Sequence, residues 1–177
     1  MTVSQQDIEH LKIIRESVRL HIEHASQYDV RGCSVLDIAP QVHAGAKEFF
    51  KHAVVKTLDI QTGADYCADI CKDNSAIIPD NSFHLVICTE VLEHVANPFA
   101  AVAEINRMLK PGGQAYVTTP FNFRIHGPLP DNWRFTEHGL RQLFSGMEIL
   151  TLEGVTTQDR DLMPIHYRLI ARKNVAG

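Results

Sequence analysis

Hydrophobic residues near the start of the chain recur every three or four positions. The apolar side chains that share this spacing are Ile8, Leu11, Ile14, Val18 and Ile22. Such spacing predicts an amphipathic helix with one apolar stripe, which packs against the rest of the fold. We therefore expect residues 1–30 to contribute a helix that covers a pocket or an edge of the sheet.

Further along the chain, short β-rich runs alternate with helical patterns. We predict strands at 34–38, 54–59, 66–69, 83–88, 114–119, 147–152 and 165–171. This alternation indicates a parallel sheet with right-handed helical crossovers. The last two strands have no helix between them, which favours an antiparallel hairpin. The predicted fold is α/β: a Rossmann-like, doubly wound, mostly parallel seven-stranded sheet with a C-terminal antiparallel hairpin.

Two later helices have clear start and stop signals. Asn97 is suited to cap the first, and Lys110-Pro111-Gly112-Gly113 ends it. Thr136 is suited to cap the second. Between the fifth strand and that helix lies a loop, 120–135, that is longer than most connections. Because long loops in compact domains are often functional, we interpret it as a substrate loop.

Composition limits the classes of protein to consider. With 177 residues, of which 45% are hydrophobic, the chain fits a single domain over 1–177. Its net charge is −4 and its basic residues form no run, so we expect no nucleic-acid partner. No stretch of about 18 residues is continuously apolar, so we expect no membrane partner. The oligomeric state is left open.

The start of the chain and its cysteines bear on location. The first residues lack the apolar stretch of a signal peptide. The four cysteines include no C-x-x-C pair, and buried free thiols fit a reducing compartment. We therefore expect a cytoplasmic protein.

Acidic side chains end three successive predicted strands, at Asp37, Asp59 and Asp69. In a doubly wound sheet the carboxyl ends of the strands face the ligand crevice, so we expect these carboxylates to converge there. Asp59 lies about 20 residues beyond the first strand, where an acidic side chain accepts both hydroxyl protons of an adenosine ribose. A lone Asp at a strand end is more often a turn former, but three in this order favour a nucleotide-like ligand.

Six segments in a fixed order resemble one known family. They are Val35-Leu36-Asp37-Ile38, Leu58-Asp59, Ala68-Asp69-Ile70, Pro79-Asp80-Asn81-Ser82-Phe83, Thr89-Glu90-Val91-Leu92-Glu93-His94-Val95 and Leu109-Lys110-Pro111-Gly112-Gly113. In these the chain is similar to the class I S-adenosylmethionine-dependent methyltransferases, especially small single-domain members of ubiquinone-biosynthesis and polysaccharide or natural-product pathways. The resemblance implies S-adenosylmethionine as cofactor. It also implies that the cofactor contacts Asp37, Ala39, Asp59, Ile60, Asp69, Ile70, Thr89 and Glu90.

The loop after the first strand departs from the family pattern. Where the family has D-x-G-x-G-x-G, this chain has Asp37-Ile38-Ala39-Pro40-Gln41-Val42-His43. Glycines there allow positive φ and close approach to the cofactor, whereas the residues present add β-carbons and Pro40 removes an N–H donor. An alternative function is therefore a non-catalytic cofactor-binding or scaffold protein with a degenerate glycine loop. An NAD-dependent dehydrogenase is disfavoured because G-x-G-x-x-G is absent.

Methyl transfer asks little acid–base chemistry of a protein, because the sulfonium already activates the methyl group. A general base is needed only where an oxygen or ammonium loses a proton. His94 and His126 are the candidate catalytic bases, since an imidazole pKa near 6.5 suits the task. An ordinary place for His94 on a helix surface stays open.

Glu90, Glu93 and His94 have i, i+3, i+4 spacing, which places three possible ligands on one helix face. The same E-x-x-E-H pattern occurs in ubiquinone-biosynthesis O-methyltransferases and plant small-RNA 2′-O-methyltransferases, where it resembles a divalent-metal site that His126 would complete here. We favour the alternative that no metal is bound, because many relatives with Val-Leu-Glu-His are metal-free.

The 120–135 loop holds the candidate substrate-binding residues His126, Trp133 and Arg134. Trp133 is suited to stack on a sugar or ring, and Arg134 to pair with a carboxylate or phosphate. The alternative, that Trp133 only anchors the loop, is equally open. We expect methyl transfer to an oxygen, and less readily a nitrogen, of a small metabolite or sugar intermediate.

Overall fold

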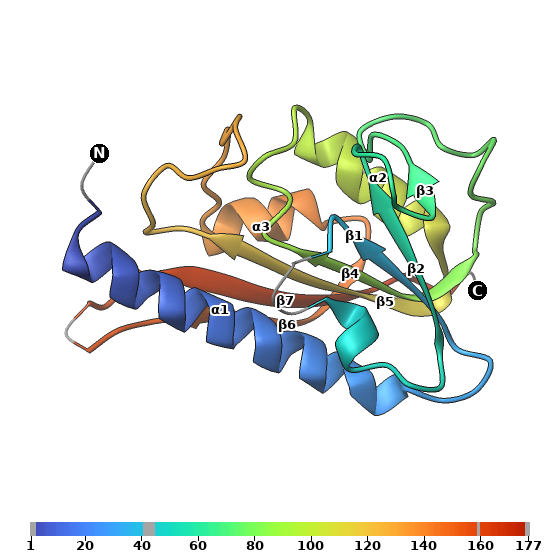
Figure 1. The fold of residues 1–177 in the computed structure, drawn as a ribbon, viewed down its shortest axis with the longest axis horizontal. Helices are drawn as coiled ribbons and strands as arrows, with labels where there is room; N and C mark the ends of the chain where they lie inside the picture. Colours follow the sequence, from blue (N-terminus) through green and yellow to red (C-terminus); the bar gives the residue numbers. More distant parts are fainter. Residues whose placement is uncertain (1–2, 41–44, 159, 176–177) are drawn as a thin grey trace.

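A single mixed sheet forms the centre of the structure (Figure 1), a computed structural model that describes residues 3–40, 45–158 and 160–175. The strands lie in the order β3-β2-β1-β4-β5-β7-β6. They are β1 (Ser34–Ile38), β2 (Val54–Asp59), β3 (Tyr66–Cys67), β4 (Phe83–Thr89), β5 (Leu109–Pro120), β6 (Glu148–Val155) and β7 (His166–Arg172). β7 is antiparallel to both neighbours and the other pairs are parallel, which confirms the predicted sheet and hairpin.

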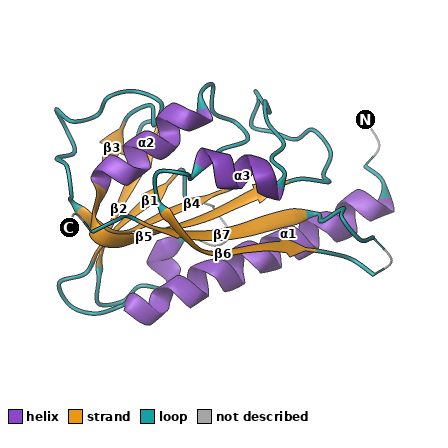
Figure 2. Cartoon of the chain, turned by 180° about the vertical axis from the view of Figure 1, so that it is seen from behind, coloured by secondary structure: helices purple, strands orange, loops and turns teal. Residues whose placement is uncertain are grey.

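Helices cover both faces of the sheet (Figures 1 and 2). α1 (Gln5–Ala25) crosses one face, and α2 (Pro98–Met108) and α3 (Glu137–Leu143) lie on the other. Ile14, Val18 and Ile22 of α1 are buried in one hydrophobic cluster with side chains of β4 and β5. Leu20, His21 and His24 of the same helix also line a pocket together with residues of β6 and β7. The apolar stripe of α1 is long enough to span a face, and it packs there.

Helical crossovers are present only in the second half of the sheet. α2 connects β4 to β5 and α3 connects β5 to β6, as predicted. Between β1 and β2, the described residues contain only the 3-10 turn Ala46–Glu48. Turns alone connect β2 to β3 and β3 to β4. The prediction of helical crossovers throughout is thus wrong. The connection 60–65 is too short for a crossover helix, whereas 68–82 is long enough for one but forms only turns.

Side chains alternate between the two faces along each strand. Leu36 and Ile38 of β1 belong to the cluster under α2 and α3, whereas Val35 belongs to the cluster under α1. Asp37 therefore points to the α1 side. The same alternation in β2 places Thr57 and Asp59 on that side, since Leu58 belongs to the opposite cluster.

β5 begins earlier than predicted, at Leu109 rather than Gln114. Gly112 adopts a φ of +78°, which favours glycine. A β-carbon on Gly113 would lie 2.9 Å from the carbonyl oxygens of His84 and Lys110, so no larger residue fits. The two glycines therefore lie inside β5, where its register against β4 shifts between Phe83 and Leu85.

Within the described part of the chain, no helix is long and apolar enough to cross a membrane. The four cysteines are free, and Cys33 and Cys88 are buried. Cys67 is exposed, so the expectation of buried thiols holds for only part of the set.

Candidate active site and cofactor pocket

A pocket of about 530 Å³ lies at the carboxyl ends of β1 and β2. This volume falls in the range of roughly 300–1,000 Å³ that is usual for small-molecule sites. Its lining comes from the ends of these strands and the turns after them: Asp37, Pro40, Gly45, Lys47, Glu48, Thr57, Asp59, Gln61, Thr62, Gly63 and Ala64. Two of the acids expected to converge, Asp37 and Asp59, thus share one pocket. Asp69 is outside this lining.

Asp37 is buried at the base of the pocket. Its Oδ2 accepts a hydrogen bond from the backbone N–H of Ala46 at 2.7 Å. Burial raises the pKa of Asp37 to about 7, although this hydrogen bond and the charge of Lys47 oppose the shift. A cationic ligand in this pocket would favour the ionised carboxylate.

Only one of the two carboxylate oxygens of Asp59 accepts a hydrogen bond from the described residues. Its Oδ1 accepts the backbone N–H of Gln61 at 2.9 Å. Its Oδ2 takes no hydrogen bond from the residues that the structure describes. Because Asp59 lines the pocket, this free oxygen is suited to accept hydroxyl protons of a ribose.

The loop after β1 takes the backbone conformation that glycine would normally supply. Ala39 adopts a φ of +47° and donates its N–H to the carbonyl oxygen of Leu58 at 2.7 Å. Pro40 follows and lines the pocket. Gln41, Val42 and His43, which also replace the family glycines, lie outside the described residues. The chain thus keeps one glycine-like turn at the cost of strain in Ala39.

Other residues expected to contact the cofactor lie at the same edge of the sheet but outside this pocket lining. Ile60 is 72% exposed, which leaves its side chain available to a ligand. Ile70 is buried in the main core. Asp69 accepts the backbone N–H of Cys71 and so forms a turn. Thr89 is buried at the end of β4.

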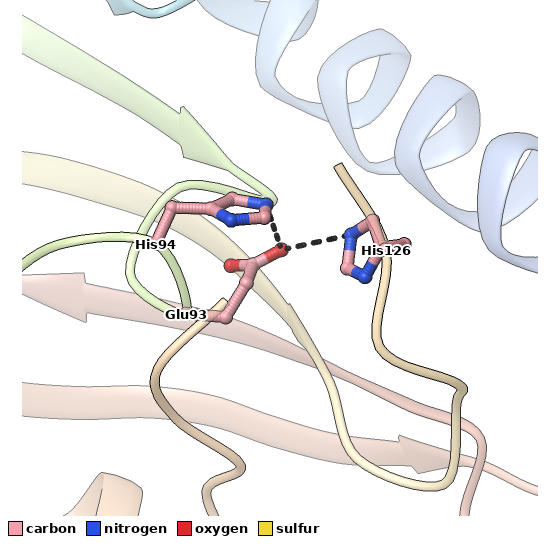
Figure 3. Close-up of side chains that lie close together, drawn as sticks. All are labelled: Glu93, His94 and His126. Carbon is pink, nitrogen blue, oxygen red and sulfur yellow. Dashed lines mark ion pairs between the residues drawn. The ribbon is translucent and has the colours of Figure 1, made fainter. Parts of the chain in front are cut away.

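The segment after β4 is a turn and not a helix. Glu90 adopts a φ of +55°, which ends the strand, and α2 begins only at Pro98. The prediction that Glu90, Glu93 and His94 share one helix face is therefore wrong. The turn nevertheless brings Glu93 and His94 together, and His126 joins them from the loop after β5 (Figure 3).

Glu93 lies between the two imidazoles (Figure 3). Its Oε1 is 3.6 Å from Nε2 of His94 and 3.8 Å from Nε2 of His126. One ligand atom from each residue lies within 4.8 Å of the other two. His94 donates from Nδ1 to the carbonyl oxygen of Pro130 at 2.9 Å, so its neutral ring carries a lone pair on Nε2. Two nitrogens and a carboxylate thus face one small space.

The carboxylate of Glu93 is fully buried. Neither of its oxygens has a hydrogen-bond partner among the described residues. Burial and the nearby charge of Glu90 raise the pKa of Glu93 well above its ordinary value. Burial also lowers the pKa of His126, so the ring favours its neutral form. Such an unpaired buried carboxylate beside neutral imidazoles is suited to a cation or a proton-donating ligand.

Glu90 instead contacts His166, the first residue of β7. Glu90 Oε1 lies 2.7 Å from Nε2 of His166, and the imidazole is fully buried. Burial alone would raise the pKa of Glu90, but His166 and its hydrogen bond lower it below the ordinary value. Sequence reasoning missed His166. The available signal was a histidine near the start of the predicted strand 165–171, but only the pairing of His166 with Pro120 places it here.

The 120–135 loop is fastened to the turn after β4. Both Asn132 and Trp133 donate their backbone N–H groups to the carbonyl oxygen of Glu93, at 2.7 and 3.1 Å. Nε1 of Trp133 donates to the carbonyl oxygen of Val95 at 2.8 Å. The other end of the loop approaches α1, where Arg124 lies 4.0 Å from Asp7. The loop therefore completes this edge of the site.

Two of the candidate substrate-binding residues have structural partners. Trp133 stacks on Phe135, with ring centroids 6.3 Å apart, and 40% of Trp133 is exposed. The indole N–H of Trp133 is thus engaged in anchoring the loop, while part of the ring is exposed. Arg134 forms a two-point ion pair with Asp131 and donates to the carbonyl oxygen of Arg124 at 3.0 Å. Its guanidinium is largely engaged in holding the loop.

The fold and this site define a class of protein: a Rossmann-like α/β domain with a ligand pocket at the carboxyl ends of its strands. The methyltransferase domain family matches residues 19–117, so the chain belongs to that family of S-adenosylmethionine-dependent enzymes. A ubiquinone biosynthesis O-methyltransferase of Xanthomonas euvesicatoria is 35% identical over 112 residues, which cover 58% of this chain and 46% of that protein. One from Photobacterium profundum is 34% identical over 62 residues, 34% of this chain and 26% of that protein. This chain thus matches less than half the length of these relatives.

Solved structures share the fold. A SAM-dependent methyltransferase of Methanosarcina mazei has a TM-score of 0.64 at 18% identity, with 88% of this chain and 98% of that chain covered. The [4+2]-cyclase SpnF has a TM-score of 0.71 at 17% identity, with 90% and 82% covered. A neighbour named as a cyclase shows that this fold alone does not fix the reaction.

Proposed function

We propose that this protein transfers the methyl group of S-adenosylmethionine to an oxygen, and less readily to a nitrogen, of a small metabolite or sugar intermediate. The observation that carries the proposal is the group formed by the buried Glu93 and the half-buried His94 and His126, at the end of the sheet that also holds the Asp37 and Asp59 pocket. The similarity to enzymes named O-methyltransferases supports oxygen as the acceptor atom.

The pocket and the group of Glu93, His94 and His126 have different roles in this proposal. The pocket binds the nucleoside, with Asp59 accepting the ribose hydroxyls and Asp37 beneath it. The exposed Ile60 packs on the adenine. The methionine part of the cofactor lies beside Glu90 and the end of β4, which is the neighbour of β1 in the sheet. The acceptor then enters beside the 120–135 loop.

The imidazoles provide the proton acceptor that an attacking hydroxyl requires. His94 donates through Nδ1, so its Nε2 lone pair is available on the side of Glu93. Burial keeps His126 neutral, as a general base must be before it accepts a proton. The loop and the turn after β4 bury Glu93 fully and half-bury the two imidazoles, which limits the access of water and favours transfer to the acceptor over hydrolysis.

The donor set also fits a divalent metal. Glu93 has two orphaned carboxylate oxygens, and an imidazole nitrogen lies on either side of it. Glu93, His94 and His126 would hold the ion, while Glu90 is engaged by His166. A bound divalent ion would lower the pKa of a coordinated hydroxyl and orient it. Carboxylate and imidazole ligands do not select one metal.

Transfer of a labelled methyl group tests the proposal. Purified protein is incubated with methyl-labelled cofactor and a small-molecule extract, and labelled products are separated by chromatography. We expect a labelled product with wild-type protein and at least about tenfold less with the Glu93→Gln variant, which removes the buried carboxylate charge. No labelled product with any extract, from a protein that binds the cofactor, would contradict it.

A non-catalytic cofactor-binding protein is the second candidate, since Ala39 and Pro40 replace flexible residues in the loop after β1. It predicts that the protein binds the cofactor without turnover. Turnover that is lost in Glu93→Gln eliminates it. The expected cytoplasmic location and the absence of a nucleic-acid partner stay predictions.

A further inference from the structure

We infer that Asp131 is a positioning residue that sets the orientation and tautomer of the His126 imidazole. The inference rests on the proposed role of Glu93, His94 and His126 as one site. It assigns a function to an acidic residue of the loop that does not itself face the site.

Asp131 contacts His126 in two ways. Its Oδ2 accepts the backbone N–H of His126 at 2.9 Å. The same oxygen lies 3.1 Å from Nδ1 of the His126 ring, at ion-pair distance, although the ring N–H is not aligned for a full hydrogen bond. The Asp131 side chain is fully buried, so water does not compete for these contacts.

A carboxylate beside Nδ1 determines which ring nitrogen carries the proton. An ionised carboxylate only accepts, so it favours a proton on Nδ1 and leaves the lone pair on Nε2. Nε2 is the atom that faces Glu93, at 3.8 Å. His94 shows the same arrangement, because a carbonyl oxygen accepts from its Nδ1. Both imidazoles therefore offer Nε2 to the site, as metal-binding histidines commonly do.

Arg134 holds Asp131 in place. Its guanidinium donates to both carboxylate oxygens and the backbone N–H of His126 donates to Oδ2, so these donors favour the ionised carboxylate. The guanidinium also donates to the backbone carbonyl of Arg124, two residues before His126. Asp131 and Arg134 thus form a buried support around which the His126 segment folds.

The Asp131→Asn variant separates this role from general stability. Every partner of the Asp131 carboxylate is a donor, so the new amide N–H₂ must face one of them. If the amide N–H₂ faces His126, it donates to Nδ1 and shifts the proton to Nε2. If it faces Arg134 instead, the amide oxygen still accepts from His126, so Asp131→Ala, which removes every acceptor at this position, is measured beside it. Asp161→Asn is the control, since Asp161 is exposed and its substitution makes the same change of charge.

Three measurements follow on wild-type, Asp131→Asn, Asp131→Ala and Asp161→Asn proteins. Nitrogen-15 NMR, with His126 assigned by its loss in His126→Asn, gives the ring tautomer in metal-free protein. Calorimetry with Mn²⁺ alone gives metal affinity. Fluorescence of Trp133, the only tryptophan, reports whether the loop stays docked.

We expect the Nδ1-protonated form of His126 in wild-type protein and its loss in Asp131→Asn, with fluorescence unchanged. Manganese affinity should fall about 10- to 100-fold in that variant and stay unchanged in Asp161→Asn. A tautomer that is unaltered in both Asp131→Asn and Asp131→Ala overturns the inference. If wild-type protein binds no manganese, the metal part of the proposed function fails, but the tautomer shift still supports the role of Asp131.

Discussion

Nε2 of His166 and Oε1 of Glu90 lie 2.7 Å apart and join the start of β7 to the turn that follows β4. Glu90 holds this position with a φ of +55°, a conformation that costs a non-glycine residue free energy. Since His166 is fully buried, the pair is shielded from water. This contact fixes the strained turn from which Glu93 and His94 extend.

Removal of the imidazole should destabilise the fold strongly. His166→Ala leaves the Glu90 carboxylate buried without its partner, and we expect a loss of about 3–5 kcal/mol in the free energy of unfolding. Urea denaturation measures this quantity. His166→Gln retains an N–H donor and should lose less free energy of unfolding. Equal losses in the two variants would show that the packing of the imidazole, and not its hydrogen bond to Glu90, stabilises the fold.

Because of Asp37, the free energy of unfolding should fall as the pH rises towards 7. The pKa of Asp37 is about 7 in the folded protein and 3.8 in an exposed carboxyl, so between these values the folded state binds a proton that the unfolded state lacks. By linkage, this contribution is complete below pH 4 and is lost as the pH rises to 7. The full change is at most about 4 kcal/mol.

The Asp37→Asn variant isolates this effect, because asparagine mimics the protonated side chain at every pH. Stability of wild-type protein relative to this variant should fall between pH 4 and pH 7. Urea titrations at several pH values measure the difference. A relative stability that is flat over this window would mean that Asp37 is ionised in the folded protein throughout.

Glycine should be favoured over the native residue at position 39. Ala39 has a φ of +47°, which strains an L-residue by roughly 1 kcal/mol and which glycine adopts freely. Ala39→Gly should therefore raise the free energy of unfolding by about 1 kcal/mol, as followed by thermal denaturation. Ala100→Gly, within α2, is the control and should lower it by a similar amount. If Ala39→Gly lowers the free energy of unfolding as Ala100→Gly does, the backbone of Ala39 is not strained.

Most of the fold was predictable because its signals are local. The boundaries of β1 and β2 match the predicted 34–38 and 54–59, where apolar and β-branched residues predominate. Asn97 caps α2 through its side chain, as expected. The position of α1 was not predictable, since an apolar stripe shows that a helix packs but not against what.

The site was less predictable, because tertiary contacts decide it. The spacing of Glu90, Glu93 and His94 fits a helix, yet the positive φ of Glu90 forms a turn that no sequence pattern marked. His166 and Asp131 act through partners far along the chain or within an irregular loop. Arg134 was expected to meet a ligand, but whether a side chain pairs within the protein depends on the folded loop.

Binding of the demethylated cofactor, S-adenosylhomocysteine, tests the central claim most directly. Asp59 has one carboxylate oxygen free in the pocket, and loss of its charged hydrogen bonds to a ribose costs about 3 kcal/mol. Calorimetry should show that wild-type protein and Asp161→Ala bind this ligand, and that Asp59→Ala binds it roughly 100-fold more weakly. Wild-type protein that binds neither S-adenosylhomocysteine nor S-adenosylmethionine would contradict the account.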